Sequence, residues 1–320
     1  MRSCLSFLMI VAAHMASSRE GSIRLLHLAG VDVFLHWSWF LVAIYEIQMG
    51  NKRYSSVGWT IAEYLALFLI VTLHEFGHAM ACRQVGGTAN QIVLWPLGGT
   101  AYVDPPPRPG ATLWSIAAGP LVNVALLPLL YGALLLGRSA GWPSAVPDLY
   151  RLVRSVLFLD VVLLVFNMLP IYPLDGGQIL RSLLWFVIGR GRSLLVATSL
   201  GFLGVAGFIG LAVWRHSLWY AALAFFMLMN CWSGLQHARA LLQLAKLPRR
   251  SGYQCPNCRT APPVGLFWKC GHCGQAFDTF QSGASCPNCR EHYAETKCLD
   301  CGKAYPMYAW ASSTLAPTSA

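Results

Sequence analysis

The chain has 320 residues and a mass of 35.1 kDa; 56% of the residues are hydrophobic, only 11% are charged, and the mean hydropathy is +0.50. A typical soluble domain carries about 25% charged residues, so composition excludes a wholly soluble protein, a disordered chain and a secreted disulfide scaffold. It predicts a mostly membrane-embedded protein. The formal net charge of +10 fits cytosolic loops that face anionic lipid, and nucleic-acid binding is not expected.

Residues 1–22 form an N-terminal segment that admits two interpretations. Arg2, the apolar residues 4–13 and the small residues 16–18 resemble a signal peptide. A misassigned start, with Met15 as the true first residue, explains the same pattern at least as well. Cleavage of a signal peptide would leave the new N-terminus outside the cell, which conflicts with the charge distribution described next.

Residues 23–247 are expected to form a transmembrane domain, because they contain about six apolar segments long enough to cross a bilayer. These expected spans cover residues 31–49, 57–82, 111–136, 152–171, 193–214 and 217–237. An even number of spans places both termini on one side, and the segments on that side carry more Lys and Arg than the other loops. We therefore expect a multi-pass protein of the cell membrane with both termini in the cytosol.

Shorter features lie between the expected spans. The segment Gln91–Tyr102 is rich in Val, Ile, Trp and Gly, which predicts a short membrane-associated β-hairpin with residues 97–99 as its turn. Residues 179–188 are expected to form a partial or interfacial helix. Glu63 lies near the outer end of the second span and is expected to be solvated.

The segment 252–310 contains four Cys-x-x-Cys pairs, and two such pairs complete a tetrahedral zinc site made of thiolates. The tail also repeats itself, because residues 255–258 match 286–289 and residues 269–277 match 297–305. The repeat favours sequential grouping over interleaved grouping of the pairs. One structural zinc is then expected on Cys255, Cys258, Cys270 and Cys273, and a second on Cys286, Cys289, Cys298 and Cys301.

The expected fold class is an all-α polytopic membrane protein with a short β-hairpin, followed by a small cytosolic tandem zinc-ribbon domain. A tail this short buries little apolar surface, so zinc would supply most of its folding free energy. Residues 311–320 are expected to be a disordered tail.

Two histidines and a glutamate stand close together inside the second expected span. His74 and His78 are four residues apart, so on a helix both imidazoles share one face and can bind one metal ion. Glu75 is displaced around the helix but remains close enough to contact a metal-bound water. Ionisable side chains are costly inside a bilayer and indicate a functional site, although a polar helix–helix contact is an alternative.

A catalytic zinc needs a third protein ligand, and Asp175 is the best candidate in the sequence. Pro170 and Pro173 would end the fourth span, and Gly176 and Gly177 permit a tight bend that aims the carboxylate inward. Capping of the following helix is an alternative role for Asp175, and it is compatible with metal binding.

Two further polar residues lie within the spans. Asp160 shares a helix face with Asn167 and is expected to line a cavity or to form a hydrogen bond between spans. Asn123 in the third span either hydrogen-bonds across helices or faces the site, and the sequence leaves both roles open.

Residues 57–180 resemble the site-2 protease family, zinc metalloproteases that cut within the membrane. The motifs that carry the resemblance are His74-Glu75-Phe76-Gly77-His78, the segment from Asn167 to Gly177, and Ala118–Asn123 in support. The resemblance implies that His74, His78 and Asp175 bind the catalytic zinc, that Glu75 is the catalytic base, and that Asn167 helps to hold the substrate carbonyl. The cysteine-rich tail departs from the nucleotide-sensing domains that similar members carry, so nothing about regulation follows from the family.

The function expected from these features is that of an intramembrane zinc endopeptidase with one catalytic and two structural Zn²⁺ ions. It would cut a membrane-spanning protein substrate in or near its transmembrane segment, as in regulated intramembrane proteolysis, while a cytosolic protein partner binds the ribbons. The predicted hairpin would either accept substrate as an added strand or plug the site. The alternative functions are an inactive membrane scaffold that presents zinc ribbons and a metal transporter. A metal transporter would not need Glu75 between its two histidines. An inactive scaffold would not need to keep His74, Glu75, His78 and Asp175 together, yet all four are present.

Overall fold

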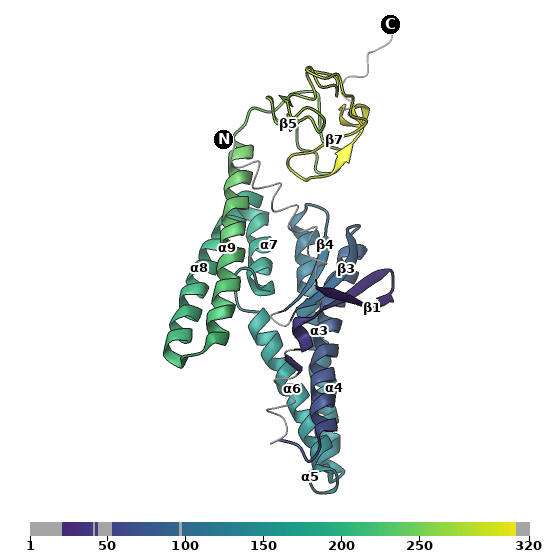
Figure 1. The fold of residues 1–320 in the computed structure, drawn as a ribbon, viewed down its shortest axis with the longest axis vertical. Coiled ribbons are helices and arrows are strands. Elements are labelled where there is room, and N and C mark those ends of the chain that lie inside the picture. The colour runs from purple at the N-terminus through teal and green to yellow at the C-terminus, as the bar shows by residue number, and fades with distance from the viewer. Residues whose placement is uncertain (1–20, 41, 44–52, 96–97, 312–320) are drawn as a thin grey trace.

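The computed structural model describes residues 21–40, 42–43, 53–95 and 98–311, and long helices make up more than half of these residues. The helices are α3 (Val57–Gln84), α4 (Pro109–Ser139), α5 (Trp142–Ala145), α6 (Pro147–Asn167), α7 (Asp175–Ile188), α8 (Arg190–Arg215) and α9 (Leu218–Ala245). Helices α3, α4 and α6 pack together, α8 packs against α9, and α7 contacts both α4 and α8 (Figure 1). The second to sixth expected spans are therefore helices, and the expected partial helix lies within α7.

The longest helices have the length and composition of membrane spans. Within the described ranges, four helices could cross a membrane, namely α3, α4, α8 and α9. Helix α6 has 21 residues but carries Arg151, Arg154 and Asp160. Large apolar side chains cover the outer faces of the helices; Leu136 is 71% exposed and Leu203 is 70% exposed. An apolar surface this extensive fits contact with lipid acyl chains rather than with water.

Four strands pair into one sheet beside α3. They are β1 (Ser22–Leu28), β2 (Val31–His36), β3 (Thr88–Trp95) and β4 (Gly98–Asp104), in the order β1-β2-β3-β4. The central pair β2–β3 is parallel, and the outer pairs are antiparallel. The expectation that residues 31–49 form a first membrane span is wrong for residues 31–36, which are strand β2. Residues 38–40 and 42–43 of that segment are helical, and residues 41 and 44–49 lie outside the described residues.

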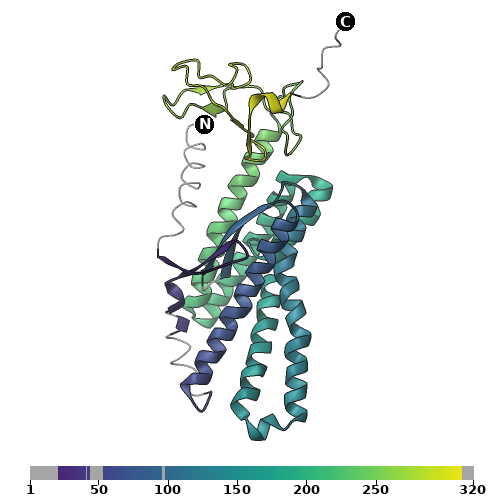
Figure 2. The same ribbon diagram turned by 90° about the vertical axis from the view of Figure 1, so that its right-hand side faces the viewer.

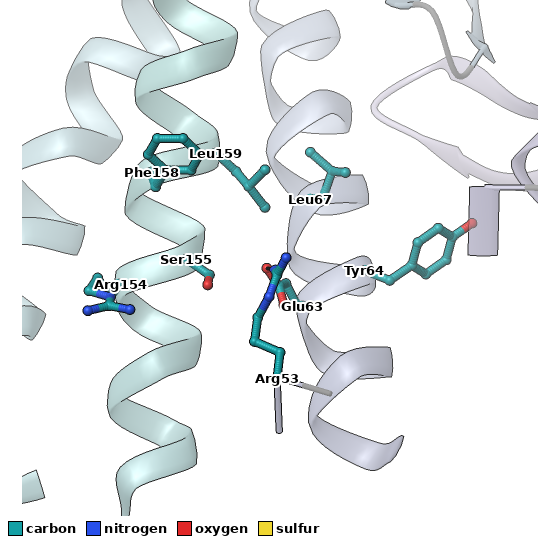
Figure 3. A pocket seen from close by; sticks show the side chains of 8 residues that line it. All are labelled: Arg53, Glu63, Tyr64, Leu67, Arg154, Ser155, Phe158 and Leu159. Carbon is teal, nitrogen blue, oxygen red and sulfur yellow. Dashed lines mark hydrogen bonds and ion pairs between the residues drawn. The ribbon is translucent and has the colours of Figure 1, made fainter. Parts of the chain in front are cut away.

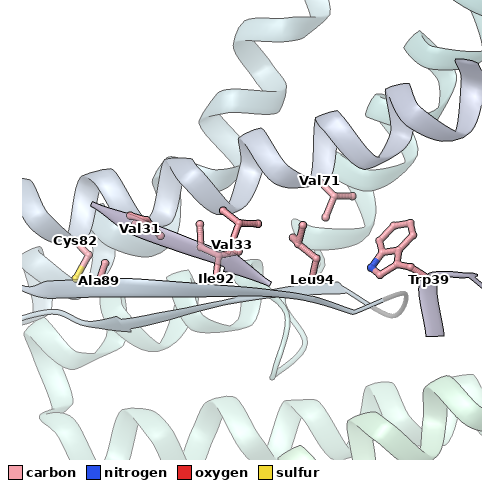
Figure 4. Close-up of a cluster of buried hydrophobic side chains, with 9 residues drawn as sticks. Val31, Val33, Trp39, Val71, Cys82, Ala89, Ile92 and Leu94 are labelled. Carbon is pink, nitrogen blue, oxygen red and sulfur yellow. The ribbon is translucent and has the colours of Figure 1, made fainter. Parts of the chain in front are cut away.

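The sheet is held on α3 by a buried apolar cluster (Figure 4). Val31 and Val33 of β2 and Ile92 and Leu94 of β3 are all 0% exposed, because alternate residues of each strand point to the same face. Cys82 belongs to α3 and is also 0% exposed. Burial of side chains of this size stabilises the fold by about 1.5–3 kcal/mol each, so the sheet and α3 form one unit.

The predicted hairpin is present as β3 and β4, which pair from Thr88–Asp104 to Trp95–Gly98. The expected turn is wrong, because Gly98 and Gly99 already belong to β4 and the connection between the strands falls on residues outside the described part. Strand β3 lies between β2 and β4, and its Val93 is completely buried on the face of the sheet opposite to Ile92 and Leu94. Whether the hairpin accepts a substrate strand or plugs the site stays a prediction.

Prolines set the helix boundaries around the site. Pro109 and Pro147 occupy the first turns of α4 and α6, where a missing backbone N–H costs nothing. Helix α6 ends at Asn167, shortly before Pro170, as the sequence predicts. Helix α7 begins at Asp175, so this carboxylate sits in the first turn of a helix and close to a helix N-terminus.

The cysteine-rich tail folds as a small unit at the end of the bundle away from α5 (Figures 1 and 2). Its strands are β5 (Trp268–Lys269), β6 (Ala276–Phe277), β7 (Thr296–Lys297) and β8 (Ala304–Tyr305), followed by a 3₁₀ turn at Met307–Trp310. They form two antiparallel hairpins, and each hairpin encloses one Cys-x-x-Cys pair. The aromatic rings of Trp268, Phe280 and Trp310 pack at its centre.

Candidate active site and zinc centres

Helix α3 presents His74, Glu75 and His78 to the interior of the membrane domain. The three side chains are buried, with exposed fractions of 4%, 6% and 6%. The imidazoles of His74 and His78 lie one turn apart on the same face, with ring centroids 4.8 Å apart. The two histidines therefore point into one small volume, as the sequence motif predicts.

Asp175 enters this volume from the first turn of α7. Its Oδ2 atom lies 3.0 Å from Nε2 of His74 and 3.5 Å from Nε2 of His78, and the two Nε2 atoms are 3.1 Å apart. In a tetrahedral zinc site with bonds of about 2.0–2.2 Å, neighbouring ligand atoms are about 3.4 Å apart. The triangle thus has the dimensions that three zinc ligands require, and these residues fit a zinc ion.

Hydrogen bonds orient both imidazoles for metal binding. Nδ1–H of His74 donates to Oδ1 of Asn123 at 2.5 Å, and Nδ1–H of His78 donates to the carbonyl oxygen of Ser115 at 2.9 Å. With Nδ1 protonated, each Nε2 keeps its lone pair for a metal. Asn123 in turn donates from Nδ2 to Oδ1 of buried Asp160 at 2.6 Å. This chain of contacts links α3, α4 and α6.

The contacts of Asn123 and Asp160 settle roles that the sequence leaves open. Asn123 hydrogen-bonds across helices to a histidine of the site, and Asp160 forms the expected hydrogen bond between helices. The contact of Ser115 runs through its backbone carbonyl, so no side-chain pattern in the sequence could have indicated it.

Gly119 lets α4 pack closely against both imidazoles. A Cβ atom at this position would lie 2.3 Å from Nε2 of His78 and 2.9 Å from Nε2 of His74, which is far inside contact distance. Any larger residue would therefore occupy the volume next to the ligand atoms. The positions of both imidazoles, and with them the triangle of ligand atoms, therefore depend on the missing side chain.

Two glycines let α7 approach the chain that precedes it. A Cβ on Gly176 would lie 2.4 Å from the carbonyl oxygen of Met168, and one on Gly177 would lie 2.4 Å from the backbone nitrogen of Tyr172. The first turn of α7 therefore packs directly on the loop that follows α6. This packing fixes the position of Asp175, which the Gly-Gly sequence was expected to aim inward.

Asn167 is the last residue of α6 and is half-buried. The hydrogen-bonding partner of His74 is Asn123, in the preceding helix along the chain. The role of Asn167 in holding a substrate carbonyl stays a prediction, as does that of Glu75 as the base.

The cysteine sulfurs form two groups, but not the groups that the sequence favours. The outer group joins the first and last pairs, Cys255, Cys258, Cys298 and Cys301, and the inner group joins Cys270, Cys273, Cys286 and Cys289. Sequential grouping is therefore wrong. The repeat misleads because each group, in either arrangement, combines one Cys-Pro-Asn-Cys pair with one pair from a hairpin. The second repeat folds back over the first, so the first pair meets the fourth and the second pair meets the third.

Sulfur–sulfur distances within each group match a zinc site. They are 3.6 Å for Cys255–Cys301 and 3.7 Å for Cys258–Cys298 in the outer group, and 3.5 and 3.6 Å for the equivalent pairs of the inner group. Zinc–sulfur bonds of about 2.3 Å place tetrahedral ligands about 3.8 Å apart. Four thiolates fill each site, so these groups suit structural zinc and leave no position for a substrate.

A separate cavity of about 650 Å³ lies between α3 and α6 (Figure 3). Its lining includes Glu63, whose carboxylate accepts a hydrogen bond from Nη1 of Arg53 at 2.8 Å. The expectation that Glu63 is solvated is wrong, because its side chain is only 9% exposed. Leu67, the lining residue of α3 nearest to the site along the helix, is about 10 Å from His74 at 1.5 Å per residue, and no residue of the metal-binding triangle lines the cavity.

Comparisons with known proteins agree with this geometry. Residues 62–148 and 143–211 match Peptidase family M50, a range that contains His74, Glu75, His78, Asn167 and Asp175. A zinc metalloprotease of Methanocaldococcus jannaschii is 34% identical over 182 residues, which cover 56% of this chain and 50% of that protein. Stage IV sporulation protein FB of Bacillus subtilis is 33% identical over 120 residues, which cover 36% of this chain and 38% of that protein.

The solved structure of a site-2 protease from Methanocaldococcus jannaschii is also similar. It superposes with a TM-score of 0.50 at 26% identity and covers 67% of this chain and 95% of that chain. This chain spans about half the length, or less, of the two curated relatives described above. The cysteine-rich tail lies outside the residues that match the family.

Proposed function

The chain belongs to the site-2 protease family, peptidase family M50, and from this premise we propose that it is an intramembrane zinc endopeptidase. Its substrate is a membrane-spanning protein that is cut in or near the transmembrane segment, as in regulated intramembrane proteolysis. The observation that carries the proposal is the convergence of His74 and His78 from α3 with Asp175 from α7, more than ninety residues apart in the chain. Three buried ligand atoms in this arrangement are costly unless they bind a cation.

His74, His78 and Asp175 hold the catalytic zinc in this proposal, and the hydrogen bonds that the imidazoles donate to Asn123 and to the Ser115 carbonyl keep both rings in the binding tautomer. Zinc in such a site supplies Lewis acidity, which polarises a peptide carbonyl and makes water a good nucleophile near neutral pH. The absence of a side chain at Gly119 lets α4 lie directly against both imidazoles, so the two ligand nitrogens stay unobstructed by a methyl group.

Glu75 is the proposed general acid–base. It takes a proton from the attacking water and then delivers it to the amine of the departing peptide, so that one carboxylate serves both steps. Asn167 is proposed to hydrogen-bond to the substrate carbonyl, whose oxygen gains negative charge as the bond is attacked. A helical substrate hides its peptide bonds, so it must unwind locally before it reaches these groups.

The proposed arrangement in the membrane puts both termini in the cytosol. The tail lies at one end of the bundle, and α5 lies at the other (Figure 1). The tail then carries two structural zinc ions in the cytosol, where thiols remain reduced, and offers a surface to a cytosolic protein partner.

The proposal is tested by reconstituting the full chain in lipid vesicles with a single-span model substrate. Glu75→Gln removes the base but leaves the three ligands, so zinc content should equal that of the wild type while cleavage falls by at least about 100-fold. Cleavage products are followed by mass spectrometry, and zinc is measured in the same samples.

Two outcomes would contradict the proposal. Unchanged cleavage by Glu75→Gln would remove Glu75 from the mechanism. Failure of the wild type to cut any member of a panel of single-span substrates, with all zinc bound, would favour the inactive scaffold.

A further inference from the structure

A short loop of the outer cysteine group contacts both β4 and the start of α8, in addition to the hydrogen bonds between residues 261–264 and the segment that follows α9. We call residues 298–303 the docking loop; it contains the ligands Cys298 and Cys301, and also Asp300 and Lys303, which point away from the sulfurs to other partners. The inner cysteine group supplies neither of these contacts. The two groups therefore differ in position, although their chemistry is the same.

One contact of the docking loop is with the sheet. Nζ of Lys303 lies 2.6 Å from Oδ2 of Asp104, the last residue of β4. The side chains are 40% and 63% exposed, so water screens this ion pair and it is weak by itself. It connects the tail to the unit formed by the sheet, α3 and α4, which carries His74 and His78.

The second set of contacts is with α8 and α9. Nη1 of Arg190, the first residue of α8, donates to the carbonyl oxygen of Asp300 at 2.6 Å. The Asp300 carboxylate accepts two hydrogen bonds from Arg249, at 2.7 and 3.1 Å, and Arg249 also donates to the carbonyl of Leu244 near the end of α9 at 2.9 Å. A two-bond arginine–carboxylate pair fixes orientation as well as distance.

These contacts bridge the two parts of the protein that together build the metal-binding triangle. The histidines come from α3, whereas Asp175 comes from α7, which packs against α8. The docking loop touches Asp104 on the first part and Arg190 on the second. The docking loop therefore connects two parts of the protein, the sheet with α3 and α7 with α8. The same two parts meet at the metal-binding triangle.

The shape of the docking loop depends on the outer cysteine group. Strands β7 and β8 have two residues each and cannot hold the loop by themselves, so ligation must supply the free energy that orders it. Ligation also ties the loop to Cys255 and Cys258, which follow Arg249 after a few residues. Without the metal, Asp300 and Lys303 would have no fixed position relative to their partners.

We propose that the outer cysteine group acts as a zinc-dependent clasp, in which bound zinc orders the docking loop and thereby joins β4 to the start of α8. The inner group maintains the core of the tail and does not control the clasp. The proposal concerns the packing of this chain and does not require that the chain be a protease.

The native pair Lys303–Asp104 provides a direct test. A water-soluble carbodiimide activates the Asp104 carboxylate, the Lys303 amine attacks it, and an amide forms while the carbodiimide leaves as its urea. The full chain in detergent micelles is treated, digested and analysed for the joined peptides by mass spectrometry. The wild type should give this cross-link, and Cys298→Ser/Cys301→Ser should lose it.

Three further variants distinguish loss of the clasp from general damage to the tail. Cys270→Ser/Cys273→Ser removes two ligands of the inner group and should keep the cross-link. Asp300→Ala leaves all cysteines in place and should lower the cross-link yield, whereas Glu295→Gln, a charge removal at an exposed tail position, should not. Retention of the cross-link after loss of Cys298 and Cys301, or an equal loss in both double-serine variants, would overturn the proposal.

Discussion

At the scale of single residues, the site is defined by what surrounds the ligands as much as by the ligands. Asn123 and the Ser115 carbonyl hold the two imidazoles, and Gly119 has no side chain that would collide with them. All three belong to α4, which contributes no ligand of its own. The spacing of His74 and His78 follows from the sequence because it is local, whereas contacts across helices depend on packing that no local pattern contains.

Gly119 provides a sharp prediction at this scale. Gly119→Ala should remove the catalytic zinc and leave the two cysteine sites filled, because the added methyl group would contact Nε2 of both histidines. Zinc content by elemental mass spectrometry should fall from about three ions per chain to about two. Gly132→Ala on the same helix is the matched control, since a Cβ there meets nothing within 4 Å. Equal zinc content in both variants would show that the space beside Gly119 is not part of the site.

At the scale of elements, the sequence predicts what depends on local pattern and misses what depends on distant pairing. Helices α3, α4, α6, α8 and α9 follow from apolar length and proline positions. Strand β2 does not, because a short apolar run has no period that separates strand from helix, and its partner β3 lies more than fifty residues away. The sequence also does not reveal that the first Cys-x-x-Cys pair groups with the last, because this grouping depends on contacts between distant segments.

The cysteine grouping can be tested by thiol reactivity. In the full chain carrying Cys270→Ser/Cys273→Ser, Cys286 and Cys289 lose their partners and should be alkylated rapidly, while Cys255 and Cys258 stay protected by Cys298 and Cys301. Zinc ligation protects thiolates from alkylating reagents, so peptide mapping after a short iodoacetamide pulse reports the grouping. Rapid alkylation of Cys255 and Cys258, with protection of Cys286 and Cys289, would instead support sequential grouping.

At the scale of the whole molecule, the tail and α5 lie at opposite ends of the helices (Figure 2). A bilayer across the bundle must therefore separate the tail from the connection between α4 and α6. The distribution of Lys and Arg predicts that the tail faces the cytosol.

Cysteine labelling in intact cells checks this orientation. Exposed Arg138, near the end of α4, and exposed Gln281 in the tail are replaced one at a time by cysteine. A membrane-impermeant maleimide should label Arg138→Cys in intact cells and Gln281→Cys only after lysis, with the parent chain as the background. The reverse pattern would place the tail outside, where the thiols would meet an oxidising environment.

The central claim is that distant parts of the chain meet at one catalytic zinc, and Asp175→Ala tests it most directly. The full-length variant is loaded with zinc beside the wild type, and bound zinc and substrate cleavage are measured in the same samples. Loss of the carboxylate leaves two histidines, so the variant should retain about two zinc ions per chain, those of the cysteine groups, and should cleave nothing. A variant that keeps the wild-type zinc content and cuts the substrate at the wild-type rate would contradict the account.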